Sequence, residues 1–284
     1  MGVRNAVIGW PRWTEDLTVT GDFDPLYPGQ NLTSLPLSRI ARLPSTSAQI
    51  TMTLPRSRPI RCLALVRHNL TLHATMRIRM YAESTGMSLV YDSGEEDVWP
   101  VVYPASQIDW ESDNFWSAKY TPDQIKDYAW TRPVWLDRAY LAQRIEIAIS
   151  DPSNLDGSLD IGLIEVSEGW QISTNFDFGA EYGFRFRTSM NQAMGGAKYG
   201  RRKPKGRVFQ GSIPDLPRDE AMARGFEFLR QADLDTPFLW LPDPQDQVNW
   251  LRNCFLATLS EPDLMAYAEP DGDSFPIRLE EVFG

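Results

Sequence analysis

The side chains that most often bind metals are scarce in this sequence. It contains two histidines, His68 and His73, and two cysteines, Cys62 and Cys254. The cysteines lie far apart and inside apolar runs, whereas the ligands of zinc sites recur at short spacings. We therefore expect no zinc centre and two reduced thiols in the core, as in a protein made in the cytosol. The histidines flank residues 69–71 at an expected loop, where a structural or surface role is favoured.

The motifs of nucleophilic catalysis and phosphate binding are also missing. The sequence has no Gly-x-Ser-x-Gly turn, no P-loop and no Gly-x-Gly-x-x-Gly after a strand. Paired carboxylates for glycoside hydrolysis leave no spacing in a sequence, so among 38 acidic residues that alternative stays open. We predict that the chain is not an enzyme and needs no cofactor.

Four oxygen-bearing side chains, Asp151, Asn154, Asp156 and Asp160, cluster between two expected strands. Calcium selects such hard oxygen ligands. The spacing differs from that of an EF-hand, because Leu155 stands where that loop needs an oxygen. A turn stabilised by Asp and Asn side chains is the favoured interpretation, and calcium binding stays open.

Residues 107–135 are rich in tryptophan and have no regular period, which predicts a long excursion from the sheet. Flat aromatic rings can stack on sugars, but they also pack in cores and at protein interfaces. The candidate contacts for a glycan or a protein are Trp110, Trp116, Tyr120 and Trp130.

A basic segment, residues 198–207, has six cations and no acid. Its cations are Lys198, Arg201, Arg202, Lys203, Lys205 and Arg207. Its glycines and proline predict a mobile loop. Such a loop can contact phosphate or dock on an acidic neighbouring subunit, and we favour the subunit. The acidic surface we expect to face it comprises Glu261, Asp263, Glu269, Asp271 and Asp273.

The sequence predicts that most of the elements that position these residues are β-strands. In residues 75–81 the apolar Met76, Ile78 and Met80 alternate with Arg77 and Arg79, as in a half-buried strand. Residues 144–149 repeat this alternation, and turn markers separate the strands. Residues 48–166 therefore predict an antiparallel β-sandwich.

The sequence changes in character near Gly169, and at 284 residues it is long enough for two domains. We expect a mainly β protein with a β-sandwich domain at 1–168. A β-barrel or sandwich domain should follow at 169–284, with one packed helix at about 218–232. Met222, Gly225, Phe226 and Leu229 would form the apolar face of that helix.

Charge and hydropathy limit the partners of the protein. The formal net charge of −10 argues against nucleic acid or an anionic membrane as the main partner. The apolar runs are shorter than the ~20 residues of a membrane span, and no secretion signal opens the chain. We expect neither membrane insertion nor secretion by the usual route.

The second half of the chain resembles the tail-tip proteins of long-tailed bacteriophages, the distal tail family and the related minor tail proteins. The segments that carry this resemblance are 183–187, 219–221, 226–229, 236–244 and 277–282. The first half is similar to the galactose-binding-type jelly rolls that phage tail proteins carry. That similarity rests on 64–70, 91–94, 98–100 and 161–162.

The resemblance implies a structural virion protein, assembled in the host cytoplasm, that joins the tail tube to hub and fibre proteins. It implies a β-barrel with one packed helix that forms rings of six copies. The jelly roll would point outward, and DNA would be only passing cargo. A carbohydrate-binding tail adhesin that contacts host glycans is the alternative, and a glycan hydrolase is a third. Host, receptor and flanking tail proteins are not encoded in any motif.

Overall fold

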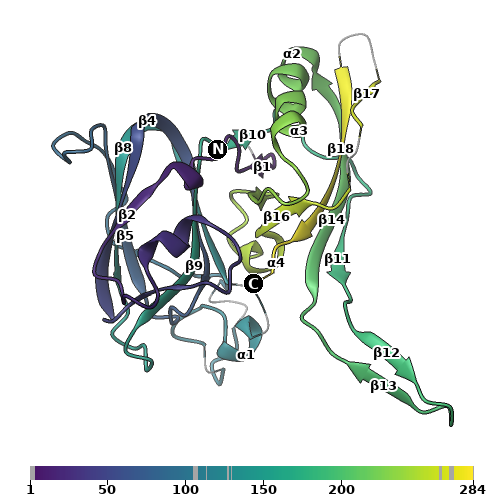
Figure 1. Cartoon of the computed structure of the whole chain (residues 1–284), viewed down its shortest axis with the longest axis horizontal. Coiled ribbons are helices and arrows are strands. Elements are labelled where there is room, and N and C mark those ends of the chain that lie inside the picture. Colours follow the sequence, from purple (N-terminus) through teal and green to yellow (C-terminus); the bar gives the residue numbers. More distant parts are fainter. Residues whose placement is uncertain are drawn as a thin grey trace. The chain divides into compact units, whose positions relative to one another are not determined.

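The computed structural model describes residues 4–104, 108–112, 114–126, 128, 130–261, 264–268 and 272–283. The chain divides into two compact units (Figure 1). Unit 1 comprises residues 1–172, 238–256 and 284, and unit 2 comprises residues 173–237 and 257–283. Both units are built mainly from antiparallel strands, which confirms the expected mainly β fold class.

Unit 1 is a jelly-roll β-sandwich whose main sheet has the strand order β3-β9-β4-β8-β5-β6, with β2 on β4 and β7 on β5. Its strands are β2 (Thr18–Thr20), β3 (Ala41–Leu43), β4 (Ser47–His68), β5 (Thr75–Tyr81), β6 (Leu89–Asp92), β7 (Glu96–Asp97), β8 (Thr131–Ser150) and β9 (Leu159–Ser167). Short helical turns lie at η1 (Thr14–Asp16), η2 (Gly29–Thr33) and α1 (Pro122–Ile125).

The two long strands β4 and β8 organise the core of unit 1. Their pairing runs from Ser47 opposite Ser150 to Val66 opposite Thr131, with register shifts at 53–58 and 60–62. In β5 the side chains of Met76, Ile78 and Met80 are buried, as the alternation predicted. Since alternate residues of a strand point to opposite faces, one face of β5 fills the apolar core and the other is more exposed, whereas β9 is buried on both faces.

A second group of strands also belongs to unit 1. β15 (Phe238–Leu241) pairs with β1 (Val7–Ile8), which also pairs with β10 (Trp170–Gln171). All four residues of β15 are buried, and the next short helix, α4 (Trp250–Asn253), also belongs to unit 1. The division therefore differs from two consecutive domains at 1–168 and 169–284. The second unit begins at residue 173 and is interrupted by 238–256.

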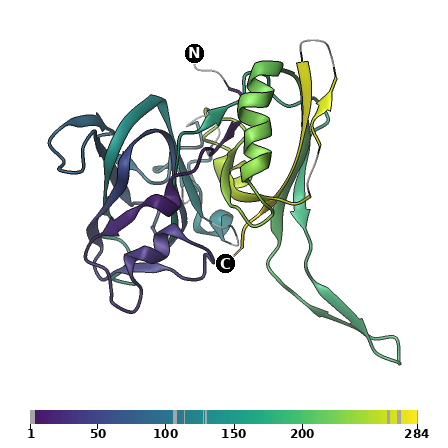
Figure 2. The ribbon, with the colours of Figure 1, turned by 45° about the horizontal axis from the view of Figure 1, so that its top comes forward.

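Unit 2 consists of an antiparallel sheet with the strand order β16-β18-β14-β11 and one helix. The strands are β11 (Glu181–Arg185), β14 (Gly206–Pro217), β16 (Phe255–Leu259) and β18 (Gly272–Glu281), with β17 (Ala266–Tyr267) on β18. Of β16, residues 257–259 belong to unit 2. The hairpin β12 (Ser189–Gln192) and β13 (Lys198–Arg201) extends from β11 and β14 and stands away from this sheet (Figure 2).

The helix of unit 2 is confirmed at its expected place. It runs through α2 (Arg218–Glu220), the π-helical η4 (Ala221–Phe226) and α3 (Glu227–Gln231). The expected apolar face is wrong in part, because Met222 and Phe226 are about half exposed. Gly225 is buried as expected, and Ala221 and Phe228 are buried with it. Small side chains let the helix approach the sheet closely, where the Phe228 ring meets Phe275 edge-on with centroids 6.4 Å apart.

Candidate functional site

Two of the four aromatic candidates, Tyr120 and Trp130, lie in or against the core of unit 1. Tyr120 is 2% exposed, and its hydroxyl donates a hydrogen bond to the carbonyl of Val248. Trp130 packs edge-on against Trp99, 5.4 Å between centroids, and its Nε1 donates to the carbonyl of Ile125 at 3.1 Å. Tyr120 is therefore a core residue, and Trp130 is a half-buried residue that packs against the core.

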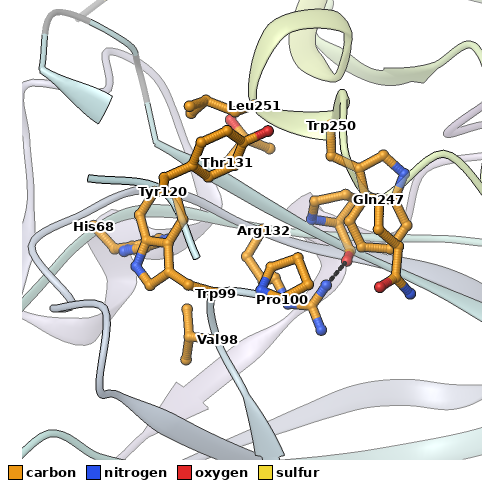
Figure 3. Close-up of a pocket in the computed structure, with 11 residues that line it drawn as sticks. His68, Val98, Trp99, Pro100, Tyr120, Thr131, Arg132, Gln247, Trp250 and Leu251 are labelled. Atoms are coloured by element: carbon orange, nitrogen blue, oxygen red, sulfur yellow. Dashed lines mark hydrogen bonds between the residues drawn. The ribbon is translucent and has the colours of Figure 1, made fainter. Parts of the chain in front are cut away.

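His68 belongs to the same aromatic cluster (Figure 3). Its ring contacts Trp99 at 5.9 Å and Trp130 at 5.7 Å between centroids. Its Nδ1 accepts a hydrogen bond from the Leu70 amide. Burial, together with the nearby charge of Arg132, lowers the pKa of His68 to about 3. The imidazole is therefore neutral at physiological pH, consistent with the structural role expected for it.

A small cavity opens beside this cluster, between Trp99, Tyr120 and Arg132 (Figure 3). Its volume of about 20 Å³ is enough for a water molecule but far too small for a sugar ring. The Arg132 guanidinium donates to the carbonyl of Pro133 at 3.2 Å and lies 3.7 Å from the Glu96 carboxylate. Thr131 Oγ1 and Arg132 Nε are buried without a hydrogen-bond partner in the protein. One buried water would satisfy such atoms.

Trp110 and Trp116 have a different environment from the rest of the aromatic stretch. Trp110 is 74% exposed and Trp116 is 93% exposed. They lie in a run of tight turns in which the Ser112 amide donates to the Asp109 carbonyl and the Phe115 amide to the Ser112 carbonyl. Phe115 meets Trp116 edge-on, with centroids 5.1 Å apart. Two broad indole rings are thus presented to solvent from one loop.

Exposure separates these two rings from every other tryptophan of the chain. The sequence has ten tryptophans, and apart from Trp110 and Trp116 all are buried or half-buried. The residues beside Trp110, namely Asp109, Glu111 and Ser112, are exposed as well. The loop therefore combines flat apolar rings with hydrogen-bonding groups.

The oxygen-rich turn of unit 1 is held by protein hydrogen bonds. Asp151 is fully buried and accepts hydrogen bonds from the Thr71 amide at 2.7 Å and the Thr71 hydroxyl at 2.6 Å. Asp160 forms a bidentate pair with Arg42, at 2.7 Å for both contacts. Asn154 Oδ1 accepts from the Asp156 amide at 3.0 Å. These contacts are those of the favoured turn rather than of a cation site.

The side chains of Cys62 and Cys254 are both buried in the core. Burial raises the pKa of the Cys62 thiol to about 12. A thiol that stays protonated is a poor nucleophile and a poor metal ligand. Within the described residues, no group of three or more His, Cys, Asp or Glu side chains is placed to hold a metal ion. In the same part of the chain, no helix has the length and apolar character needed to cross a membrane.

The basic segment, expected to be a mobile loop, lies partly in strands, with residues 202–205 between them. Residues 198–201 form β13, and Arg207 lies in β14, 3% exposed. The Arg207 side chain pairs with the buried Glu281, so it is not part of a docking surface. The other five cations, Lys198, Arg201, Arg202, Lys203 and Lys205, are exposed.

The acidic surface expected to face these cations is not one surface. Asp273 is 2% exposed and pairs with Arg218 at 3.4 Å. Glu261 is exposed and pairs with Arg278 of the same unit at 2.5 Å. Asp263, Glu269 and Asp271 lie outside the described residues. Asp273 is therefore excluded as a docking partner, because its carboxylate is already used within the fold.

A scan against protein-family models finds no match for this chain, and a search of the curated proteins finds none either. The solved structures that match the chain include carbohydrate-binding modules and a fucosidase of Ruminococcus gnavus. The family 32 module of Clostridium perfringens NanJ, in complex with galactose, is 13% identical with a TM-score of 0.36, and the match covers 57% of this chain and 98% of that one. A fucose-binding module of Streptococcus pneumoniae is 9% identical with a TM-score of 0.35, covering 55% and 96%. A chitosan-binding module of a Paenibacillus species is 9% identical with a TM-score of 0.37, covering 55% and 97%.

Proposed function

We propose that this protein is a non-catalytic carbohydrate-binding protein whose jelly-roll unit contacts a glycan through Trp110 and Trp116. The observation that carries the proposal is the exposure of these two rings, when the other tryptophans of the chain are buried or half-buried. An exposed large aromatic side chain lacks the roughly 1.5–3 kcal/mol of stabilisation that its burial would give. Two exposed tryptophans in one loop therefore favour a binding role. A sugar offers the matching surface, since its C–H face stacks on an indole while its hydroxyls reach polar groups.

The polar residues around the rings fit such a ligand. Asp109 and Glu111 flank Trp110 and are exposed, so their carboxylates can accept hydrogen bonds from sugar hydroxyls. The small cavity beside Trp99 is excluded as the sugar site by its volume. The glycan would therefore lie on the open loop rather than in a closed pocket.

A glycan array probed with the full chain tests this function. We expect the wild-type protein to bind a limited set of glycans and the double variant Trp110→Ala/Trp116→Ala to bind none of them. Leu155→Ala is the matched control, because Leu155 is fully exposed elsewhere in unit 1. A wild-type protein that binds no glycan, or a double variant that binds as the control does, contradicts the proposal. Retention of a protein partner by the same two rings would point to a protein interface instead.

A second candidate function is that of a ring-forming subunit of a bacteriophage tail tip, located in the virion and bound to tail-tube, hub or fibre proteins. The observation that favours it is the hairpin of β12 and β13, in which every residue is exposed. Such a hairpin suits a chain that works in contact with other subunits. Native mass spectrometry of the full chain at increasing concentration should find closed assemblies, six copies by the resemblance. A protein that stays monomeric at every concentration, and in particles, would contradict this candidate.

A further inference from the structure

The hairpin that extends from the sheet of unit 2 has no core of its own. We call residues 186–205 the arm. All residues of β12 and β13 are exposed, and these strands pair only with each other. An isolated two-stranded hairpin is marginally stable in water. A surface that covers the arm would therefore stabilise it.

Both faces of the arm carry the same combination of groups. Residues directly opposite in an antiparallel pair share a face, and Asn191 lies opposite Tyr199 while Gln192 lies opposite Lys198. Tyr199 and Arg201 thus occupy one face, and Met190 and Lys198 occupy the other. Tyr199 is 66% exposed and Met190 is 60% exposed. Met194 at the tip is completely exposed. Apolar contact and positive charge are available on either side.

The arm is strongly basic in an acidic chain. It contains six Lys and Arg residues and no Asp or Glu. Since the whole chain has a net charge of −10, the rest of the chain carries −16. A second copy therefore offers the arm a surface of opposite charge, whereas the same acidic body repels nucleic acid.

The base of the arm is held in place by contacts within unit 2. Arg185 and Arg187, on the strand that enters the arm, both form ion pairs with Glu280. The Arg187 guanidinium also lies over the Phe283 ring, 4.6 Å from its centroid. Gly206, on the returning strand, packs against the Phe283 ring. These contacts hold the base of the arm in a defined position on unit 2.

We propose that the arm docks on a second copy of this chain, which covers its apolar side chains and faces its cations with acidic groups. Because both faces and both outer strand edges are open, the arm fits a groove or the edge of a sheet rather than a flat patch. This inference deepens the second candidate function, since a ring needs self-association, but it holds for any assembly that uses the arm.

Sedimentation velocity of the full chain tests the inference. We expect the wild-type protein to associate as its concentration rises, and added salt to weaken the association by screening the cations. The charge variant Arg201→Ser/Arg202→Ser/Lys203→Ser should associate about tenfold more weakly. The apolar variant Met190→Ser/Met194→Ser/Tyr199→Ser should also associate at least about tenfold more weakly. Circular dichroism should show both variants folded, because an exposed hairpin contributes little to the core.

Matched variants on unit 1 control for the loss of charge and of apolar surface. Arg4→Ser/Arg39→Ser/Arg56→Ser removes three exposed cations, and Leu26→Ser/Met87→Ser/Leu155→Ser removes three exposed apolar side chains. Both controls should associate as the wild type does. A monomeric wild-type protein, or arm variants that associate as the controls do, overturns the inference. So does an arm variant that loses only binding to double-stranded DNA in a gel-shift assay. An assembly that depends on the arm but stops at a dimer would support the inference and contradict the second candidate function, which requires a ring.

Discussion

Arg207 and Glu281 form a buried ion pair between the neighbouring strands β14 and β18. The Arg207 side chain is 4% exposed and that of Glu281 is 4% exposed. The Arg207 amide also donates to the same carboxylate at 2.8 Å. This pair lies where β14 leaves the arm and enters the sheet, so it ties the root of the arm to the core of unit 2. Its partners are 74 residues apart in the sequence.

We expect Glu281→Ala to destabilise the protein by about 3–5 kcal/mol, because it leaves the buried guanidinium without the carboxylate that compensates its charge. Urea unfolding followed by fluorescence measures the change. Glu261→Ala is the matched control, since Glu261 pairs with Arg278 at an exposed site, where a pair contributes about 0–1 kcal/mol. Equal losses in the two variants would refute the structural role of the buried pair.

The buried imidazole of His68 predicts a pH dependence of stability. Its pKa is about 3 in the folded protein and near the ordinary 6.5 when unfolded. At a pH between these two pKa values, His68 binds a proton in the unfolded chain but not in the folded chain. Stability from this group is complete above pH 6.5 and falls as the pH drops from 6.5 toward 3, at roughly 1.4 kcal/mol per pH unit.

The His68→Gln variant isolates this effect from the titration of carboxylates. Between pH 6.5 and about 5, the difference in unfolding free energy between wild type and His68→Gln should change by about 2 kcal/mol. His73→Gln, which replaces the other histidine, should show the wild-type dependence. A wild-type profile that His68→Gln leaves unchanged would mean that His68 is not the group responsible.

Trp240 tests whether β15 belongs to the core of unit 1. Its side chain is 1% exposed, and it pairs across the strands with Ile8. Truncation of such a residue to alanine should cost about 3–5 kcal/mol, whereas Trp110→Ala, at an exposed ring, should change stability by about 0.5 kcal/mol or less. Thermal unfolding of both variants measures the contrast. Similar melting temperatures for the two would contradict the placement of β15.

The sequence predicts regular elements well where one short segment carries its own signal. The alternation of residues 75–81 defines a strand, and acidic residues followed by an apolar period define the helix at 218–231. The partner of β15 has no such signal, because four consecutive apolar residues do not tell which sheet they join. The association of 238–241 with residues near the N-terminus is a long-range contact that only the folded chain reveals.

The sequence predicts which stretch holds the candidate site but not which of its aromatic residues are exposed. The tryptophan-rich stretch stands out by composition. Without a regular period, however, nothing in it distinguishes the buried Tyr120 and the half-buried Trp130 from the exposed Trp110 and Trp116. The glycines and proline of residues 198–207 predict a loop, although residues 198–201 form a strand. This strand depends on the pairing of 189–192 with 198–201, which single-residue preferences do not report.

Calorimetric titration of a glycan selected by the array into the full chain tests the carbohydrate-binding proposal most directly. We predict saturable binding to the wild-type protein and a loss of roughly tenfold or more in affinity for Trp116→Ala, because each stacked ring contributes on the order of 1–3 kcal/mol. Leu155→Ala should bind as the wild type does. An unchanged affinity in Trp116→Ala and Trp110→Ala would contradict the central claim that these two rings form the binding surface.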